Sequence, residues 1–365
     1  MRGMWVTYFE LGALFDAPEG FRAAWDALLD KVEQVGVNAL FVHVRSHCDA
    51  YYPSELFPWS KYCTGSKGTP GADPGFDPLD YMLAAAHRRG MAFHAWINPY
   101  RVLYDSDDLA MLADDSPAKR WLTDEDGGND SWVQAAAGGL YLNPAAGPVQ
   151  ALVVDGVREL VSRYDVDGVH FDDYFYPVSD ESFDEREYVS YRTAVWDDPL
   201  PLADWRRAHV TAMLARVCDT VHTVRGGCVF GVSPMASVEG NYSRAYADVA
   251  AWLDAGAVDY LMPQLYFGFE YPDETCRFDA LLTRWKAVVG ERSVPLYAGL
   301  GAYRINSTDS GHEEWRARHD LLARQICCGR QEGCAGYCLY SFGALFTDDE
   351  PHAAERAALR RLLDH

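Results

Sequence analysis

The segment from residue 166 to residue 177 carries the strongest chemical signal in the sequence. An apolar strand ends there in two adjacent carboxyl groups, Asp172 and Asp173, with aromatic residues on both sides. Because side chains alternate along a strand, His170, Asp172 and Tyr174 are expected to share one face. A carboxyl group next to another carboxyl group and among aromatic rings should have a raised pKa, which suits a general acid. The alternative is a pair of aspartates that caps a loop.

Polar residues also stand at the ends of other apolar segments. Such groups are costly to bury unless they are used, so we expect them to converge on one pocket. We predict Asp172 and Asp173 as the catalytic residues. The residues predicted to bind substrate are Arg45, His94, Asn98, Arg101, His170, Tyr174, Ser233, Glu239, Gln264 and Tyr266.

Some of these residues also have a purely structural interpretation. Arg45 and Arg101 either bind a substrate carboxylate, hold the catalytic acids or form structural salt bridges. His94 could equally be a hydrogen-bonded core histidine. Gln264 and Tyr266 share one face of their strand and could donate hydrogen bonds to a sugar acetamido or hydroxyl group.

Glycosidases usually carry a pair of carboxylates, and the second one is the weak point of the pattern. The candidates are Asp173, Glu239 and Glu270, and spacing does not select among them. Asp259 begins its strand and is therefore expected at the opposite end of the sheet.

The elements that must position these residues alternate between strand and helix along the whole chain, as parallel α/β folds do. The expected strands are residues 4–8, 39–44, 91–97, 168–172, 228–233, 258–266, 294–300 and 336–341. The expected helices are residues 21–35, 79–89, 149–164, 205–224, 245–253, 278–289, 314–327 and 352–363.

Eight strand–helix units are the number that a closed barrel requires, so the sequence predicts an α/β fold, a (β/α)₈ TIM barrel, in one domain spanning residues 1–365. Long loops follow the second, third and fourth strands, at residues 46–78, 98–144 and 174–201. Since loops after strands build the active-site face of such a barrel, these three should form the walls of a cleft.

The formal net charge of −22, with no basic run, argues against nucleic acid and anionic membrane surfaces as partners. No apolar stretch is long enough for a membrane-spanning helix. Residues Met1, Arg2 and Gly3 lead directly into a strand, so no signal peptide is expected. We expect a monomer.

The nine cysteines do not form the pattern of a small disulfide-rich protein. A cluster near the end of the chain is either a metal site or a set of small buried side chains. Its spacing lacks the paired C-x₂-C units of zinc sites, so we predict no metal and no cofactor. The cluster consists of Cys327, Cys328, Cys334 and Cys338.

Several longer motifs follow one another along the chain. They are RGMWVT at residues 2–7, DAYYP at 49–53, PWSKY at 58–62, HAWINPYR at 94–101, YLNP at 141–144, DGVHFDDYFYP at 167–177, DWRR at 204–207, GVSP at 231–234 and PQLY at 263–266. Through these motifs the sequence resembles the bacterial glycosyl hydrolase-like 10 family over nearly its whole length. The resemblance implies a (β/α)₈ barrel that hydrolyses glycans, and it adds Tyr100 to the expected substrate-binding residues.

Relatives in the family that the sequence resembles are envelope proteins that cut peptidoglycan glycan strands stripped of their stem peptides. It therefore implies a polysaccharide substrate and a place in the cell envelope or outside the cell. The fourth strand is also similar to that of chitinase-type barrels, which read Asp-Gly-x-Asp-x-Asp-x-Glu. His170 and Asp172 stand at the positions of the two later aspartates, and Tyr174 stands at the position of the glutamate. Phe267 stands where the family usually has tryptophan.

The first hypothesis is therefore a glycosidase acting on β-linked, N-acetylated amino-sugar polymers, such as denuded peptidoglycan. Asp172 would protonate the leaving oxygen. Asp173 would activate water or hold the N-acetyl group, and Arg45 or Arg101 would meet the lactyl carboxylates.

Two alternatives remain open. One is a glycan-binding barrel without catalysis. The other is a metal-dependent deacetylase that uses His43, His94, His170 and Asp172, although the H-x-H and H-E-x-x-H patterns are absent.

Overall fold

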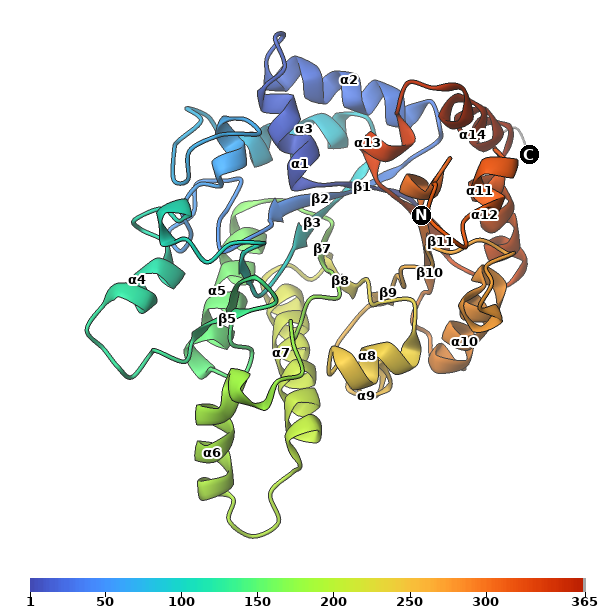
Figure 1. Ribbon diagram of the computed structural model, residues 1–365. Helices are drawn as coiled ribbons and strands as arrows, with labels where there is room; N and C mark the ends of the chain where they lie inside the picture. Colours follow the sequence, from blue (N-terminus) through green and yellow to red (C-terminus); the bar gives the residue numbers. More distant parts are fainter. Residues whose placement is uncertain (364–365) are drawn as a thin grey trace.

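In the computed structural model, which describes residues 1–363, eight parallel strands form one sheet that curves into a barrel (Figure 1). In sheet order they are β10 (Tyr297–Gly301), β11 (Gly336–Tyr340), β1 (Arg2–Val6), β2 (Ala39–Arg45), β3 (Ala92–Ile97), β7 (Gly168–Phe171), β8 (Val229–Val232) and β9 (Tyr260–Leu261). Two further bridges, from Leu261 to Leu296 and from Gln264 to Gly299, join the outer strands of this order. The predicted (β/α)₈ barrel is confirmed.

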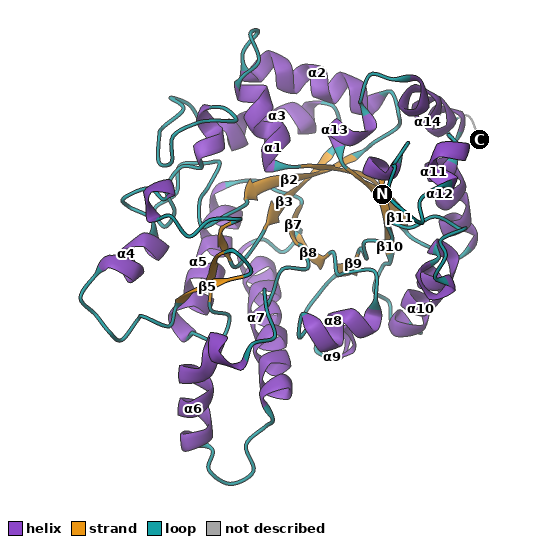
Figure 2. Cartoon of the chain, in the orientation of Figure 1, coloured by secondary structure: helices purple, strands orange, loops and turns teal. Residues whose placement is uncertain are grey.

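Helices surround the barrel (Figure 2). The outer layer contains α2 (Phe21–Glu33), α3 (Pro78–Arg88), α5 (Gly147–Arg163), α7 (Leu202–Val224), α9 (Val249–Asp254), α10 (Phe278–Val289), α12 (Leu321–Gln331) and α14 (Glu350–Arg361). Shorter helices are α1 (Tyr8–Phe15), α4 (Pro117–Thr123), α6 (Glu185–Ala194), α8 (Val238–Arg244), α11 (Glu314–Ala317) and α13 (Phe342–Leu345). None of the described helices is both long and apolar enough to cross a membrane.

Local sequence explains where the long helices begin and end. Trp25, Leu28 and Val32 recur at helical spacing on α2 and are fully buried against the barrel. The chain then turns at Gly36, where φ is +75° and glycine carries no Cβ penalty. Helix α3 is capped at its start by Asp77, whose side chain accepts a hydrogen bond from the Asp80 amide.

One expected helix is shortened in the structure and another is divided. The helix expected at residues 245–253 begins only at Val249, as α9, because Tyr246 has a φ of 53° and Asp248 caps the helix. The helix expected at residues 314–327 becomes α11 and α12. The Glu355 carboxylate of α14 caps α12 by accepting hydrogen bonds from the amides of Leu321 and Leu322, at 2.7 and 3.3 Å.

The long loops contain more regular structure than the sequence suggested. The excursion after β3 holds α4 and a three-stranded antiparallel sheet in the order β4 (Arg101–Leu103), β6 (Gly139–Leu142), β5 (Val133–Ala136). The loop after β7 carries α6, and α1 directly follows β1. Conversely, the strand expected at 258–266 is regular only at β9 and continues past Pro263, which has no amide hydrogen to donate, as isolated bridges at Gln264.

The interior of the barrel is packed with large rings. A lumen cluster separate from the strand–helix core comprises Trp5, Ala39, Phe41, Trp96, Tyr260, Met262 and Cys338. Glycines in the strands make room for these rings. A Cβ on Gly168 would overlap the ring of His94, and a Cβ on Gly231 would overlap the ring of Tyr260.

The loop after β7 is held by a buried ion pair. Both side chains are 0% exposed, and Arg206 Nη2 lies 2.6 Å from Asp184 Oδ1. The same guanidinium donates to the carbonyl oxygens of Ser179 and Asp180 and to the Tyr246 hydroxyl, at 3.2, 2.6 and 3.0 Å. Arg206 on α7 therefore fixes the wall of the cleft that begins at Asp173.

We expect Arg206→Met to destabilise the protein by about 3–5 kcal/mol, because it leaves the Asp184 carboxylate buried without its partner. Urea unfolding measures this loss. Arg158→Met is the control, since the side chains of Arg158 and Asp155 are 51% and 52% exposed and such pairs contribute about 0–1 kcal/mol. Equal losses for the two variants would contradict the role given to Arg206.

Candidate active site

Asp172 follows the last residue of β7 at the mouth of the barrel and is only 4% exposed. Trp96 Nε1 donates a hydrogen bond to its Oδ2 at 3.1 Å. Asn98 Nδ2 lies 3.2 Å from Oδ2 and 3.3 Å from Oδ1, and the Tyr174 amide donates to Oδ1 at 3.4 Å. Neutral donors therefore hold the carboxyl group, and no cation lies within 4.0 Å of it in the described chain.

The surroundings of Asp172 raise its pKa to about 7 from an ordinary value of 3.8. Burial is the largest cause, and repulsion from Asp173 adds to it. The positive charge of Arg101 and the hydrogen bond from Trp96 oppose the shift. At neutral pH a large fraction of this carboxyl group is therefore protonated, as a general acid requires.

Asp173 is half-buried beside Asp172 and has its own polar partner. Gln264 Nε2 donates to Asp173 Oδ1 at 2.8 Å and to the Ser233 carbonyl oxygen at 3.1 Å. Burial raises the pKa of Asp173, and the hydrogen bond from Gln264 limits the increase. The structure thus brings Asp173, Ser233 and Gln264 together from β7, β8 and β9, as the strand ends predicted. The Ser233 hydroxyl has no hydrogen-bond partner.

Arg101 is the cation whose positive charge lowers the pKa of both Asp172 and Asp173. Its amide donates to Asn98 Oδ1 at 3.0 Å, which turns the chain so that the guanidinium lies between the rings of Tyr8 and Tyr174, at 5.4 and 5.5 Å from their centroids. Arg101 Nε donates to the Ser46 carbonyl oxygen at 3.0 Å. It forms no ion pair with a described carboxylate, so its charge is available to both aspartates and to a ligand.

Aromatic side chains surround the acids. Tyr266 stacks on Tyr340 with ring centroids 5.6 Å apart, and Tyr303 packs edge-on against Tyr266 at the same distance. Tyr174 is 50% exposed and Tyr303 is 41% exposed, so their rings are accessible to a substrate. Exposed aromatic rings are suited to stacking on the apolar faces of sugars.

Three residues of this site were missed in the sequence: Trp96, Tyr303 and Tyr340. Trp96 has the same parity as Asn98 on its strand, and Tyr340 ends the eighth strand. Asp172 was selected because it stands at the end of an apolar strand. The same criterion, applied to aromatic as well as polar side chains, would have found both Trp96 and Tyr340. Tyr303 lies in a short turn after β10 that carries no comparable pattern.

The histidines expected to bind substrate lie deeper in the lumen. Trp5 Nε1 donates to His170 Nε2 at 3.3 Å, and the Tyr260 hydroxyl lies 2.9 Å from His170 Nδ1 and 3.3 Å from His94 Nδ1. His170 is 0% exposed and His94 is 4% exposed, and burial lowers the pKa of both. They are hydrogen-bonded core histidines that support the floor of the site.

Arg45 does not reach the pocket. A register shift in the pairing of β2 with β3 falls between His43 and Arg45 and interrupts the alternation that would have turned Arg45 inward. The guanidinium instead stacks on Phe57, 3.8 Å from the ring centroid, next to Gly156 of α5. The structure therefore places Arg45 away from Asp172 and Asp173, against the expected convergence on one pocket.

Tyr100 and Glu239 also lie away from the acids. Tyr100 is 1% exposed and belongs to the strand–helix core. Glu239 is exposed on α8, where it pairs with Arg284 of α10 at 3.5 Å. Glu270, the remaining candidate for the second carboxylate, is exposed as well, which leaves Asp173 as the carboxyl group next to Asp172.

Among the described residues, one group has the ligand types and proximity of a metal site: Cys218, His222 and Asp259. It lies at the opposite end of the barrel, where Asp259 accepts hydrogen bonds from His222 and the Phe230 amide. Asp167 makes the equivalent hydrogen bonds with His87 and the Phe93 amide, in an arrangement that includes no cysteine. The repeated arrangement indicates a structural link between helix and strand.

The four cysteines near the end of the chain do not gather as ligands. Cys338 faces the lumen next to Gly3, whereas Cys327 and Cys328 lie on α12 in the outer layer. The histidines of the deacetylase hypothesis, together with Asp172, form no ligand group either.

The sequence is similar to those of known glycosyl hydrolases. The profile of the family described as glycosyl hydrolase-like 10 matches residues 1–317. Glycosyl hydrolase YngK of Bacillus subtilis (strain 168) is 35% identical over 323 residues, which cover 83% of this chain and 59% of YngK. Glycosyl hydrolase DigH of Escherichia coli (strain K12) is 34% identical over 309 residues, which cover 79% of this chain and 67% of DigH.

The structure of the PgaB (BpsB) glycoside hydrolase domain from Bordetella bronchiseptica aligns with a TM-score of 0.63 and 16% identity over 98% of both chains. Fold and similarity together define a glycoside-hydrolase-like TIM barrel. The chain belongs to the glycosyl hydrolase-like 10 family, which confirms the resemblance seen in its motifs. It spans about three fifths of YngK, at 59% of that protein's length.

The raised pKa of Asp172 predicts a pH-dependent stability. The folded-state pKa lies above the unfolded one, so the wild type loses stability as pH rises from about 4 to about 7. Asp172→Asn carries no such proton, and its stability relative to wild type should therefore grow by about 2–4 kcal/mol over this interval. Urea unfolding at a series of pH values measures the difference. A difference that stays constant with pH would mean that Asp172 ionises normally.

Proposed function

We propose that this protein is a glycoside hydrolase that cleaves β-linked, N-acetylated amino-sugar polysaccharide, with denuded peptidoglycan glycan strands as its substrate. The observation that carries the proposal is the buried carboxyl group of Asp172, whose pKa of about 7 suits an acid at neutral pH. The family and the aromatic side chains around the acids support a carbohydrate substrate.

In this proposal Asp172 protonates the oxygen of the leaving sugar. Its Oδ2 accepts hydrogen bonds from Trp96 and Asn98 at 3.1 and 3.2 Å, and its Oδ1 accepts from the Asn98 side chain and the Tyr174 amide at 3.3 and 3.4 Å. Trp96 and Asn98 hold the group in place and stabilise the carboxylate left after proton transfer.

Asp173 holds the N-acetyl group of the substrate or activates the attacking water. If the acetamido oxygen is the nucleophile, no carboxylate nucleophile is needed. Both Nε2 hydrogens of Gln264 are engaged, and its Oε1 is left to accept a hydrogen bond from a substrate amide or hydroxyl. Arg101 supplies positive charge for the carboxylate of a neighbouring sugar.

The direct test is release of soluble fragments from amidase-treated peptidoglycan. We expect release by wild type and a loss of about 100- to 10,000-fold in Asp172→Asn, because this variant has no proton to give. Arg158→Met, on the outer surface of α5, should release fragments at the wild-type rate. Pull-down of the glycan without release by any version would favour a binding barrel. Loss of activity on chelation would favour metal-dependent hydrolysis.

The rate should also depend on pH in a defined direction. Because Asp172 must be protonated, kcat/KM should fall as pH rises above about 7. Arg101→Met removes a charge that lowers the pKa of Asp172, so the fall should move to higher pH, whereas Arg101→Lys should keep it near the wild-type position. A pH–rate profile unchanged in Arg101→Met would contradict this assignment.

A further inference from the structure

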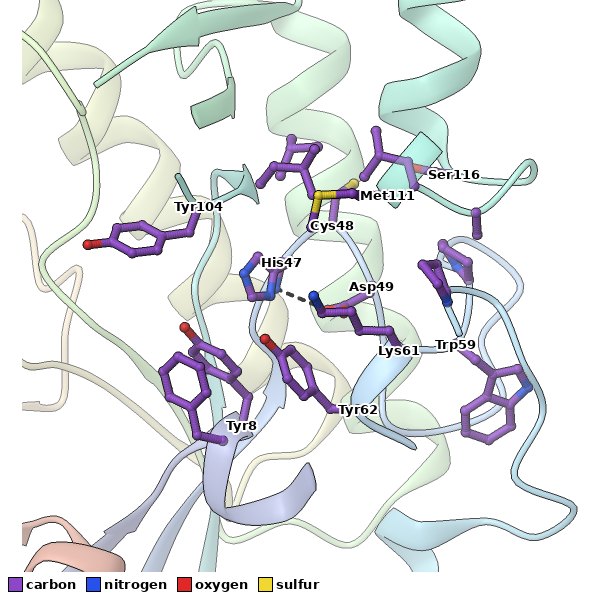
Figure 3. A pocket seen from close by; sticks show the side chains of 17 residues that line it. Tyr8, His47, Cys48, Asp49, Trp59, Lys61, Tyr62, Tyr104, Met111 and Ser116 are labelled. Carbon is purple, nitrogen blue, oxygen red and sulfur yellow. Dashed lines mark hydrogen bonds between the residues drawn. The ribbon is translucent and has the colours of Figure 1, made fainter. Parts of the chain in front are cut away.

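A cavity opens between the loops that follow β2 and β3 (Figure 3). Together with its open mouth, the cavity encloses about 700 Å³ of space free of protein atoms. Residues from three parts of the chain line it, among them Tyr8, Trp59, Lys61, Tyr62 and Tyr104. None of these residues has a role in the chemistry proposed above.

Packed side chains connect the wall of the cavity to the acids. The ring of Tyr8 lies 5.5 Å from the ring of His43, which stacks on Trp96 at 3.3 Å, and Trp96 donates to Asp172. Tyr8 also covers one side of Arg101. Tyr8, which lines the cavity, and Tyr174, which follows the acids, thus both contact the Arg101 guanidinium.

Most of the cavity wall is aromatic or apolar. Tyr62 packs against Tyr8 with ring centroids 5.0 Å apart, and Tyr104 is 54% exposed at the rim. Apolar walls with a few polar groups are typical of ligand sites. Aromatic rings can cover the C–H faces of a sugar, so the wall suits a pyranose ring better than a strongly hydrated ion.

Lys61 provides the charge of the cavity. Its ammonium group lies 5.0 Å from the Tyr62 ring and forms no ion pair with a described carboxylate. In Figure 3 its side chain reaches across the cavity toward His47, and its charge contributes to the lowered pKa of that histidine. In a protein of net charge −22, an unpaired lysine inside an aromatic cavity is a specific feature.

One carboxyl group, Asp49, also lines the cavity. It accepts a hydrogen bond from the His47 amide at 3.0 Å, and burial raises its pKa. The Asp49 carboxyl group is thus turned toward its own loop.

We propose that this cavity is a sugar subsite that binds a hexosamine unit carrying a carboxylate, with Lys61 pairing with the carboxylate and Tyr62 and Tyr104 contacting the ring. This inference rests on the proposed function, in which the substrate is a glycan strand with an exposed lactyl carboxylate on every second sugar. The subsite makes the enzyme select such strands over neutral polymers of N-acetylated hexosamine.

The test compares two glycans bound to Asp172→Asn protein, which does not degrade them. One is the soluble strand from amidase-treated peptidoglycan, and the other is the same strand with its carboxyl groups reduced to alcohols. Lys61→Met keeps the apolar stem of the side chain and removes the charge. Lys61→Arg restores the charge, and Lys67→Met is the control, an exposed lysine of the same loop that does not line the cavity.

By titration calorimetry, Lys61→Met should weaken binding of the carboxylated strand about five- to tenfold and leave binding of the reduced strand unchanged. Lys61→Arg and Lys67→Met should bind both strands as the Asp172→Asn protein does. Equal weakening for the two glycans, or none, would overturn the subsite while the proposed function stands. If neither glycan binds any variant, the proposed function and the subsite fail together.

Discussion

Burial of Asp172 without a direct ionic partner is the constraint on which the candidate site depends. A carboxylate removed from water is unstable unless it is paired or neutralised, and here four neutral donor contacts and a more distant arginine replace the pair. The balance leaves the group close to half protonated at neutral pH. Had Arg101 formed an ion pair with it, the same aspartate would be fully ionised and unable to give a proton.

This balance requires a rigid floor. Trp96 can donate to Asp172 only if its indole is fixed, and His43 stacks on it from one side. Below them, Trp5, His170 and Tyr260 are joined by hydrogen bonds across the lumen, and glycines in the neighbouring strands leave the space these rings need. The histidines are therefore structural, and their neutral forms avoid adding further charge beneath the acid.

Much of the fold and the centre of the site could be predicted from the sequence, because they depend on local periodicity. Alternation along each strand correctly brought Asp172, Asn98 and Gln264 to one end of the barrel. It failed at Arg45, where a one-residue irregularity turns the side chain outward. It also could not show that helix α12 starts at Leu321, since the capping carboxylate of Glu355 comes from 34 residues further along the chain.

Arg101 is at once the first residue of β4 and the main positive charge acting on Asp172. The position of the three-stranded sheet that contains β4 and the proton affinity of Asp172 are therefore thermodynamically linked. If the small sheet moved outward, the Arg101 charge would move away from Asp172 and the pKa of Asp172 would rise. By thermodynamic reciprocity, protonation of Asp172 favours the outward position of the sheet. Variation in the length or packing of the insertion after β3 would therefore change the acidity of Asp172 without any change in the acid itself.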